Sequence, residues 1–116
     1  MVSLSYELEP LGIKVKLIEP GMINTNFAET TGSMINYDPE QTEYGPFMDK
    51  ALAAMQSAGS QGSDPILVAE TIMQAATDGT DQMRYIAGPD AEQVIAARKA
   101  MDDAEYMAMM KGQLGL

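Results

Sequence analysis

The spacing of apolar residues at the start of the chain changes from one that predicts a helix to one that predicts a strand. Residues 3–9 carry leucines spaced to share one helical face, and Pro10 and Gly12 end this segment. Residues 13–19 (IKVKLIE) form a β-rich apolar run, which Pro20-Gly21 breaks abruptly. We therefore expect a helix, then a strand, then a sharp turn.

The strand over residues 13–19 has two possible environments. Leu17 and Ile18 are adjacent apolar residues, which indicates burial on both faces of a parallel sheet. Lys14 and Lys16 alternate with apolar residues, which fits a half-exposed hairpin strand instead. The parallel sheet is favoured because no Asn-Gly type turn and partner strand follow within hairpin distance.

The middle of the chain is predicted to be a long polar loop followed by two helices. Residues 28–45 are polar and irregular, and loops of this length often act as lids. Residues 47–57 have helical spacing, and a second helix begins with Asp64 as N-cap and Pro65 in its first turn. The second helix ends at Gly79, and its expected apolar face comprises Val68, Ile72, Met73 and Ala76.

The last third of the chain begins with a second short strand, over residues 83–87, which Gly88-Pro89 closes. The helix before it would return the chain so that this strand lies parallel to the first. Asp90 and Gln93 match a capping box for a helix that ends near Ala100, and residues 103–111 have helical composition. The expected fold is a single α/β domain with two short parallel strands, a crossover helix and flanking helices.

Composition removes several kinds of chemistry from the chain. The net charge is −10 and the 7 basic residues form no dense patch, so no nucleic acid and no membrane is expected as a partner. Without Cys or His, the chain has no thiolate or imidazole to bind a metal or activate a nucleophile. No apolar run approaches the ~18 residues of a membrane span and no signal peptide follows Met1, so a cytoplasmic location is expected.

Two groups of residues have both a functional and a structural interpretation. The pair Asp102-Asp103 could be a metal site or an acid/base pair, but adjacent carboxylates on a helix diverge, so we expect a solvated surface and no metal. Met55, Met73 and Met83 fall on core-facing spacings, where Met is more often a gap filler. The C-terminal methionines are the candidates for docking onto another subunit: Met101, Met107, Met109 and Met110.

The order of strand, Pro-Gly turn, Thr25, polar loop, helix, strand and Gly-Pro-Asp resembles the C-terminal part of the classical short-chain dehydrogenases/reductases. The likeness is carried by residues 5–27 (SYELEPLGIKVKLIEPGMINTNF) and 64–91 (DPILVAETIMQAATDGTDQMRYIAGPDA), and it extends over nearly all 116 residues. It implies that residues 1–116 are a single partial domain, the C-terminal part of a Rossmann-like, doubly wound parallel sheet.

The resemblance also implies where ligands bind. In that family the turn after the strand lines the nicotinamide pocket, so NAD or NADP would contact Pro20, Gly21, Ile23 and Thr25, with Thr25 as the side chain that holds the carboxamide. Residues 26–62 take the place of the family's substrate cleft. The residues that the resemblance implicates there are Phe27, Tyr37, Tyr44, Phe47 and Met48.

The chain departs from the family at its catalytic residues. None of the 5 tyrosines is followed by Lys four residues on, and the Gly59 to Gly62 segment has no strand before it, as a dinucleotide loop requires. We therefore assign no catalytic residue, and the resemblance implies that the catalytic Tyr and Lys precede Met1.

Two functions are carried forward. The first is the C-terminal portion of an NAD(P)-dependent oxidoreductase for an alcohol or carbonyl substrate, inactive by itself. The second is a noncatalytic binding or assembly module, whose open strand edge pairs with a fuller subunit or in a homo-oligomer.

Overall fold

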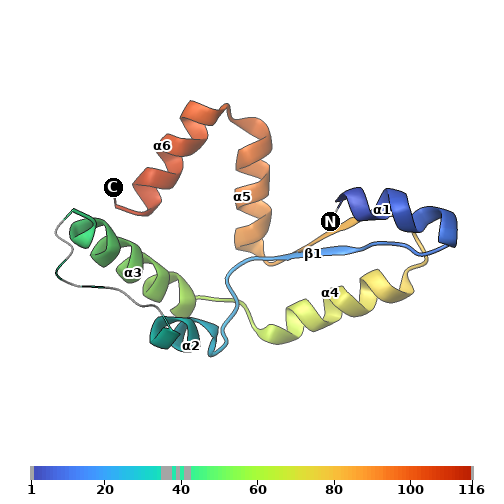
Figure 1. Cartoon of the computed structure of the whole chain (residues 1–116), viewed down its shortest axis with the longest axis horizontal. Coiled ribbons are helices and arrows are strands. Elements are labelled where there is room, and N and C mark those ends of the chain that lie inside the picture. Colours follow the sequence, from blue (N-terminus) through green and yellow to red (C-terminus); the bar gives the residue numbers. More distant parts are fainter. Residues whose placement is uncertain (1, 35–37, 39, 41–42, 116) are drawn as a thin grey trace.

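The computed structural model describes residues 2–34, 38, 40 and 43–115, which form an α/β structure with two parallel strands (Figure 1). The elements in chain order are α1 (Val2–Leu8), the 3-10 turn η1 (Glu9–Leu11), β1 (Leu17–Pro20), α2 (Phe27–Met34), α3 (Gly45–Ser60), α4 (Pro65–Thr77), β2 (Arg84–Ala87), α5 (Pro89–Ala100) and α6 (Asp103–Gln113). Gly12 ends η1 in the left-handed conformation, with φ of 72°.

The two strands and α4 form a crossover unit. Strands β1 and β2 run parallel, with Leu17 opposite Arg84 and Pro20 opposite Ala87, and α4 packs against both strands. Asp64 caps α4 by accepting the Ile66 N–H at 2.9 Å. The predicted parallel crossover is therefore confirmed, the hairpin alternative is wrong, and a Rossmann-like sheet is compatible with this arrangement.

Strand β1 is shorter than its apolar run. It begins at Leu17 rather than Ile13, because its partner strand has only four residues to pair with. Just before the strand, the Lys16 ammonium donates to the backbone carbonyl oxygens of Thr80 and Gln82, at 2.6 and 2.7 Å. Leu17 and Ile18 are half-buried, so the expected burial on both faces is not reached within the described chain.

Two local predictions are wrong. Residues 28–45 were expected to be irregular, but α2 occupies residues 27–34; the Asn26 carbonyl and the Thr25 hydroxyl accept backbone N–H groups of its first turn. The capping box expected at Asp90 is absent, because the N-cap of α5 is Gly88 and the Asp90 carboxylate accepts the Met22 N–H instead. A capping box does form in α6, between Asp102 and Glu105.

Little of the described chain is buried. The buried hydrophobic residues are Ala75, Tyr85, Ala87 and Ala91. The predicted apolar face of α4 is only partly correct, since Val68 is half-buried whereas Ile72 and Met73 are 51% and 64% exposed. Of the three methionines expected in the core, Met83 is half-buried, and Met55 and Met73 are exposed.

The molecule is extended rather than round. Its radius of gyration is 17.8 Å, against about 13 Å for a compact domain of this length. Helices α1 and α4 flank the strands at one end, and α2, α3, α5 and α6 gather at the other (Figure 1). Exposed large apolar residues occur at both ends, and surface of this kind is typical of an interaction surface. They include Tyr6, Leu11, Phe27, Met34, Tyr44, Ile66 and Met73.

A polar cluster ties the start of β1 to the loop before β2. The buried Tyr85 hydroxyl donates to the Asp78 carboxylate at 2.5 Å, and the Lys16 ammonium donates to the same hydroxyl at 3.2 Å. Lys16 also lies 5.3 Å from the centre of the Tyr85 ring and 3.8 Å from Asp78. The Thr80 N–H donates to Asp78 at 2.9 Å. This cluster fixes the register of the two strands.

The cluster predicts a dependence of stability on pH. Hydrogen bonds from the Tyr85 hydroxyl and the Thr80 N–H, with a smaller effect of Lys16, lower the pKa of Asp78 below its ordinary 3.8. Because the folded-state pKa is the lower one, this stabilisation is present above 3.8 and is lost as the pH falls through the folded-state pKa. Asp78→Asn should therefore make the free energy of unfolding, measured by urea titration, less sensitive to acid.

Asp49→Asn is the matched control, because Asp49 is exposed on α3. It should keep the acid sensitivity of the unaltered chain. The pKa of Asp81 is also lowered, chiefly by its hydrogen bond to Lys14, but Asp81 is present in both variants. Equal acid sensitivity of Asp78→Asn and Asp49→Asn would contradict the role of the cluster.

Candidate functional site

The turn that follows β1 is held by three other parts of the chain. The Gly21 N–H donates to the carbonyl of Ala87, at the end of β2, at 3.0 Å. The Met22 N–H donates to Asp90, in the first turn of α5, at 2.6 Å. The segment between α3 and α4 then forms a short parallel bridge, with Ser63 donating to Met22 and accepting from Asn24, both at 2.9 Å. The backbone of the turn is therefore fixed by tertiary contacts.

Gly62 allows this bridge to form. A Cβ at Gly62 would lie 2.8 Å from the Asn24 nitrogen and 2.8 Å from the Ile23 carbonyl carbon, which are backbone atoms. Backbone atoms cannot move aside as the end of a flexible side chain can. Because the two backbones approach so closely, only glycine fits at position 62.

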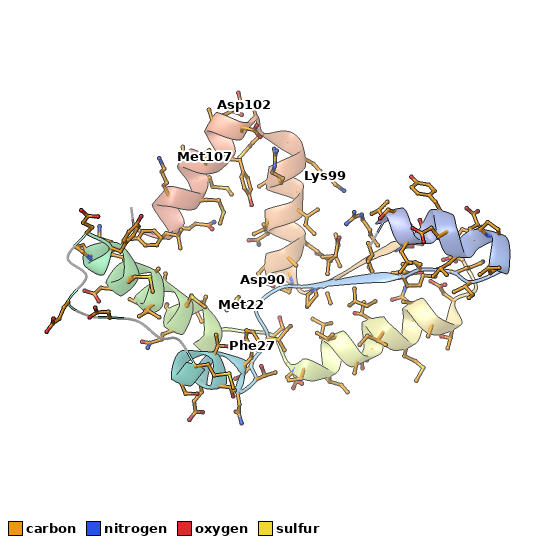
Figure 2. The ribbon with its side chains drawn as sticks, viewed as in Figure 1. Met22, Phe27, Asp90, Lys99, Asp102 and Met107 are labelled. Carbon is orange, nitrogen blue, oxygen red and sulfur yellow. The ribbon has the colours of Figure 1, made fainter. Side chains whose placement is uncertain are left out.

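A cavity of about 690 Å³ runs along the turn. Residues 21–27 form one wall, and Met55, Gln56 and Gly59 of α3 contribute to the other. The volume lies in the range of small-molecule and cofactor sites. Figure 2 shows Met22 near Asp90 at the start of α5, and Phe27 beside α2.

A second cavity, of about 550 Å³, adjoins the first, since Gly21, Met22 and Met55 line both. Its lining is mainly apolar and comes from Pro20, α3, α5 and α6. The apolar side chains from α5 and α6 are Ala91, Val94, Ile95 and Met110. The turn therefore stands between a mixed cavity and an apolar one.

The structure brings most of the predicted cofactor residues together. Gly21, Ile23 and Thr25 line the larger cavity, and Pro20 lines the apolar one. The Thr25 oxygen accepts the Phe27 N–H at 3.3 Å, so the hydroxyl keeps its own hydrogen to donate to a ligand. The predicted contacts thus share one turn at the carboxyl end of β1.

The predicted substrate residues are more dispersed. Phe27 lines the larger cavity and is 73% exposed. Tyr44 and Phe47 are exposed near the start of α3, and Met48 is half-buried there, whereas the part of α3 that lines the cavity is its later half. Tyr37 lies outside the described residues.

Sequence reasoning missed the residues that hold the turn. Gly62 was considered only as part of a glycine pattern, Asp90 only as a helix cap, and Ser63 was not singled out. A single sequence carries no local signal for these contacts, because they join the turn to segments about 40 and 70 residues away in the chain. Met55, expected in the core, lines both cavities instead.

Tyr85 and Lys16 are in hydrogen-bond contact but form no catalytic pair here. The Tyr85 hydroxyl is buried and donates to Asp78, and Lys16 donates to two backbone carbonyls. Lys16 precedes β1 whereas Thr25 follows it, so the two groups lie at opposite ends of the strand. A general acid or base must reach the proton that it transfers, which this pair cannot do for a ligand at Thr25.

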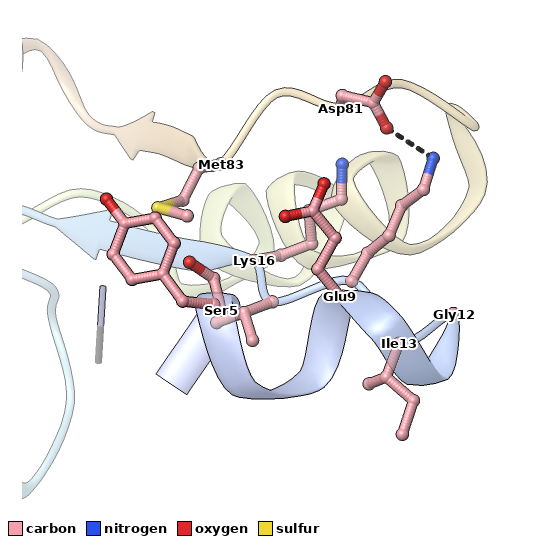
Figure 3. Close-up of a pocket in the computed structure, with 10 residues that line it drawn as sticks. Ser5, Glu9, Gly12, Ile13, Lys16, Asp81 and Met83 are labelled. Carbon is pink, nitrogen blue, oxygen red and sulfur yellow. Dashed lines mark ion pairs between the residues drawn. The ribbon is translucent and has the colours of Figure 1, made fainter. Parts of the chain in front are cut away.

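A third cavity, of about 320 Å³, lies between α1 and the start of β1 (Figure 3). Lys14 and Asp81 form an exposed ion pair at its rim, at 2.6 Å, and the hydrogen bond between them raises the pKa of Lys14. Ligands of open parallel sheets bind at the carboxyl ends of the strands, and this cavity is at the amino end. We therefore place the candidate site at the Pro20 turn.

The described residues offer neither a metal site nor a membrane-spanning helix. Within residues 2–34, 38, 40 and 43–115, no three His, Cys, Asp or Glu side chains are grouped so that they could hold a metal ion. Over the same ranges, no helix has the length and apolar character needed to cross a membrane. In the described structure Asp102 caps α6, and Asp103 pairs with Arg98 at 2.6 Å.

The chain is similar over nearly its whole length to proteins named oxidoreductases. Two uncharacterized oxidoreductases of Schizosaccharomyces pombe are each 34% identical over 114 residues, which is 98% of this chain and 47% of theirs. An uncharacterized oxidoreductase of Bacillus subtilis is 29% identical over 97% of this chain and 41% of its own length. No protein-family model matches, and no solved structure does. The chain spans about half the length of the curated relatives it matches.

Proposed function

We propose that this chain supplies the nicotinamide-facing turn of an NAD(P)-dependent oxidoreductase of the short-chain dehydrogenase/reductase type. The observation that carries the proposal is the cavity of about 690 Å³ along residues 21–27, which opens at the carboxyl end of β1. The similarity to named oxidoreductases over 98% of the chain supports it independently. The rest of the cofactor site would come from outside these 116 residues.

The residues of the turn are compatible with nicotinamide. Thr25 is exposed and its hydroxyl can donate to a carboxamide oxygen, while Ile23 offers an apolar side chain to the ring. The bound cofactor would supply the hydride acceptor or donor. The part of this chain is to orient the nicotinamide, because the proton of the alcohol would be moved by a group that the described residues do not contain.

The two cavities suggest how an alcohol or carbonyl substrate would sit. The mixed cavity contains Thr25 and would receive the cofactor, and the adjoining apolar cavity would receive the substrate's hydrocarbon part. Met55 and Met22 lie where the two meet. Phe27 remains our proposed aromatic contact, and Tyr44, Phe47 and Met48 remain proposed contacts of the surrounding loop.

The proposal is tested by grafting. Residues 1–116 would replace the matching 114 residues of one Schizosaccharomyces pombe relative. We expect this chimera to enhance nicotinamide fluorescence on binding NADH or NADPH, and the chain alone not to. Thr25→Val in the chimera should weaken binding about 10-fold, because one hydrogen bond to the carboxamide is lost.

Thr30→Val is the matched control, since Thr30 is an exposed residue of α2. It should leave the affinity unchanged. Failure of the chimera to bind when the unaltered relative binds, or failure of the relative itself, would contradict the proposal. Binding of the cofactor by the isolated chain would also contradict it.

The second candidate function is a noncatalytic assembly module. It is supported by the large exposed apolar area and by strands that, within the described ranges, pair on one side only. An open strand edge invites pairing with another chain. The mass of the isolated chain in solution distinguishes the two: a stable dimer that binds no cofactor favours assembly, and a monomer counts against it.

A further inference from the structure

The carboxylate of Asp90 occupies the inside of the turn after β1. Its Oδ2 accepts the Met22 N–H at 2.6 Å. Its Oδ1 is buried and accepts no hydrogen bond from the described residues. Figure 2 shows Asp90 at the start of α5, directly beside Met22. A buried carboxylate oxygen without a hydrogen bond is costly, so the place of Asp90 Oδ1 in the fold requires a reason.

Glycines from both strand ends make room for this carboxylate. Gly21 follows β1, and a Cβ added to it would overlap the Asp90 carboxyl group. Gly88 follows β2, and a Cβ there would lie 2.8 Å from Asp90 Oδ1. Gly88 has a positive φ of 117°, whereas Gly21 is not among the glycines with positive φ. Gly21 therefore meets a spatial demand rather than a conformational one.

The contact also explains why the turn keeps its shape. The Gly21 N–H is held by Ala87, and the Met22 carbonyl by Ser63. Asp90 holds a further donor of the bend, the Met22 N–H. A negative charge in the first turn of α5 is further favoured by the helix dipole. With these groups fixed, Ile23 and Thr25 are held toward the larger cavity.

We propose that Asp90 is a positioning residue that fixes the Pro20–Thr25 turn, and that position 21 is glycine in order to seat the Asp90 carboxylate. Its consequence for nicotinamide binding rests on the proposed function, but the contact itself does not. In this proposal Gly21 makes room for a side chain of the same protein.

The contact is tested first on the chain as it is. Asp90→Ala should increase the exchange rate of the Met22 amide, followed by NMR, about 10-fold or more, because that amide loses a charged acceptor. Glu92→Gln is the matched control, as Glu92 is exposed in the same turn of α5. It should leave the Met22 amide unchanged. Equal exchange in Asp90→Ala and Glu92→Gln would overturn the proposal.

The seating of the carboxylate is tested by rescue. Gly21→Ala should lower the urea midpoint sharply, because the new methyl group collides with Asp90. Gly21→Ala combined with Asp90→Ala removes the collision, so the double variant should be more stable than Gly21→Ala. This holds even if Gly21→Ala is unfolded in water. A double variant no more stable than Gly21→Ala would overturn the proposal.

The positioning role is tested in the chimera described above. Asp90→Ala removes the acceptor of the Met22 N–H and should weaken NADH affinity about 10-fold. Asp90→Asn retains an oxygen acceptor for that N–H and should weaken the affinity less. An unchanged affinity in Asp90→Asn and Asp90→Ala would overturn the positioning role. If the unaltered chimera binds no cofactor, the proposed function fails, and the exchange and rescue experiments still decide the role of Asp90.

Discussion

Replacing Tyr85 with alanine is expected to lower the free energy of unfolding by about 3–5 kcal/mol. Tyr85 is 3% exposed and lies in β2, where its ring packs under Lys16 and its hydroxyl donates to Asp78. The substitution would leave a cavity and remove the donor on which the polar cluster is centred. Urea titration followed by circular dichroism measures the change.

Tyr6→Ala is the matched control, because Tyr6 is 72% exposed on α1. It should change stability by no more than about 0.5 kcal/mol. Tyr85→Phe separates the ring from the hydroxyl and should cost about 1–3 kcal/mol, since Asp78 loses its Tyr85 hydrogen bond. If Tyr85→Ala lowered the free energy of unfolding no more than Tyr6→Ala does, the burial of the Tyr85 side chain would be disproved.

Gly62→Ala is expected to destabilise the chain by about 1–3 kcal/mol, because its methyl group meets the backbone of Ile23 and Asn24 and forces them apart. The Asn24 amide, which donates to Ser63 at 2.9 Å, should then exchange faster with solvent. Urea titration and amide exchange measured on the same sample test both expectations.

Gly59→Ala provides a control of opposite sign three residues earlier. Gly59 lies in α3, and a Cβ there has no atom within 4 Å. The change should stabilise the helix by about 0.5–1 kcal/mol. Equal effects of the two substitutions would show that no close backbone approach exists at Gly62.

The elements that the sequence predicted correctly are those specified by neighbouring residues. Asp64 and Pro65 define the start of α4 through a cap and a fixed φ, and the structure has both. Gly12 ends the first helical segment by adopting the left-handed conformation. The parallel order of β1 and β2 was predicted because the helix before the second strand would return the chain, with no hairpin turn to reverse it.

The predictions that failed depend on contacts across the chain. The length of β1 is limited by β2, and the partner of Asp90 is a backbone amide 68 residues away. Helix α2 was missed because polar residues such as Thr30 suit a loop as well as a helix. The exposure of Met73 on α4 follows from which face of that helix meets the strands.

The candidate site was predictable in position but not in construction. The break of an apolar run at Pro20-Gly21 located the turn, and the structure places Ile23 and Thr25 on a cavity there. What holds the turn could not be derived, because Gly62, Ser63 and Asp90 reach it only through tertiary structure. The loop residue Tyr37 stays a prediction.

The small number of buried side chains has a thermal consequence. The increase in heat capacity on unfolding scales with the apolar area that becomes hydrated. In this chain by itself, much of the apolar area of the described residues is already exposed to solvent in the folded state. Its stability should therefore vary only weakly with temperature. In any larger assembly that contains this chain, most of the heat-capacity change of unfolding would come from the interface that buries its exposed side chains.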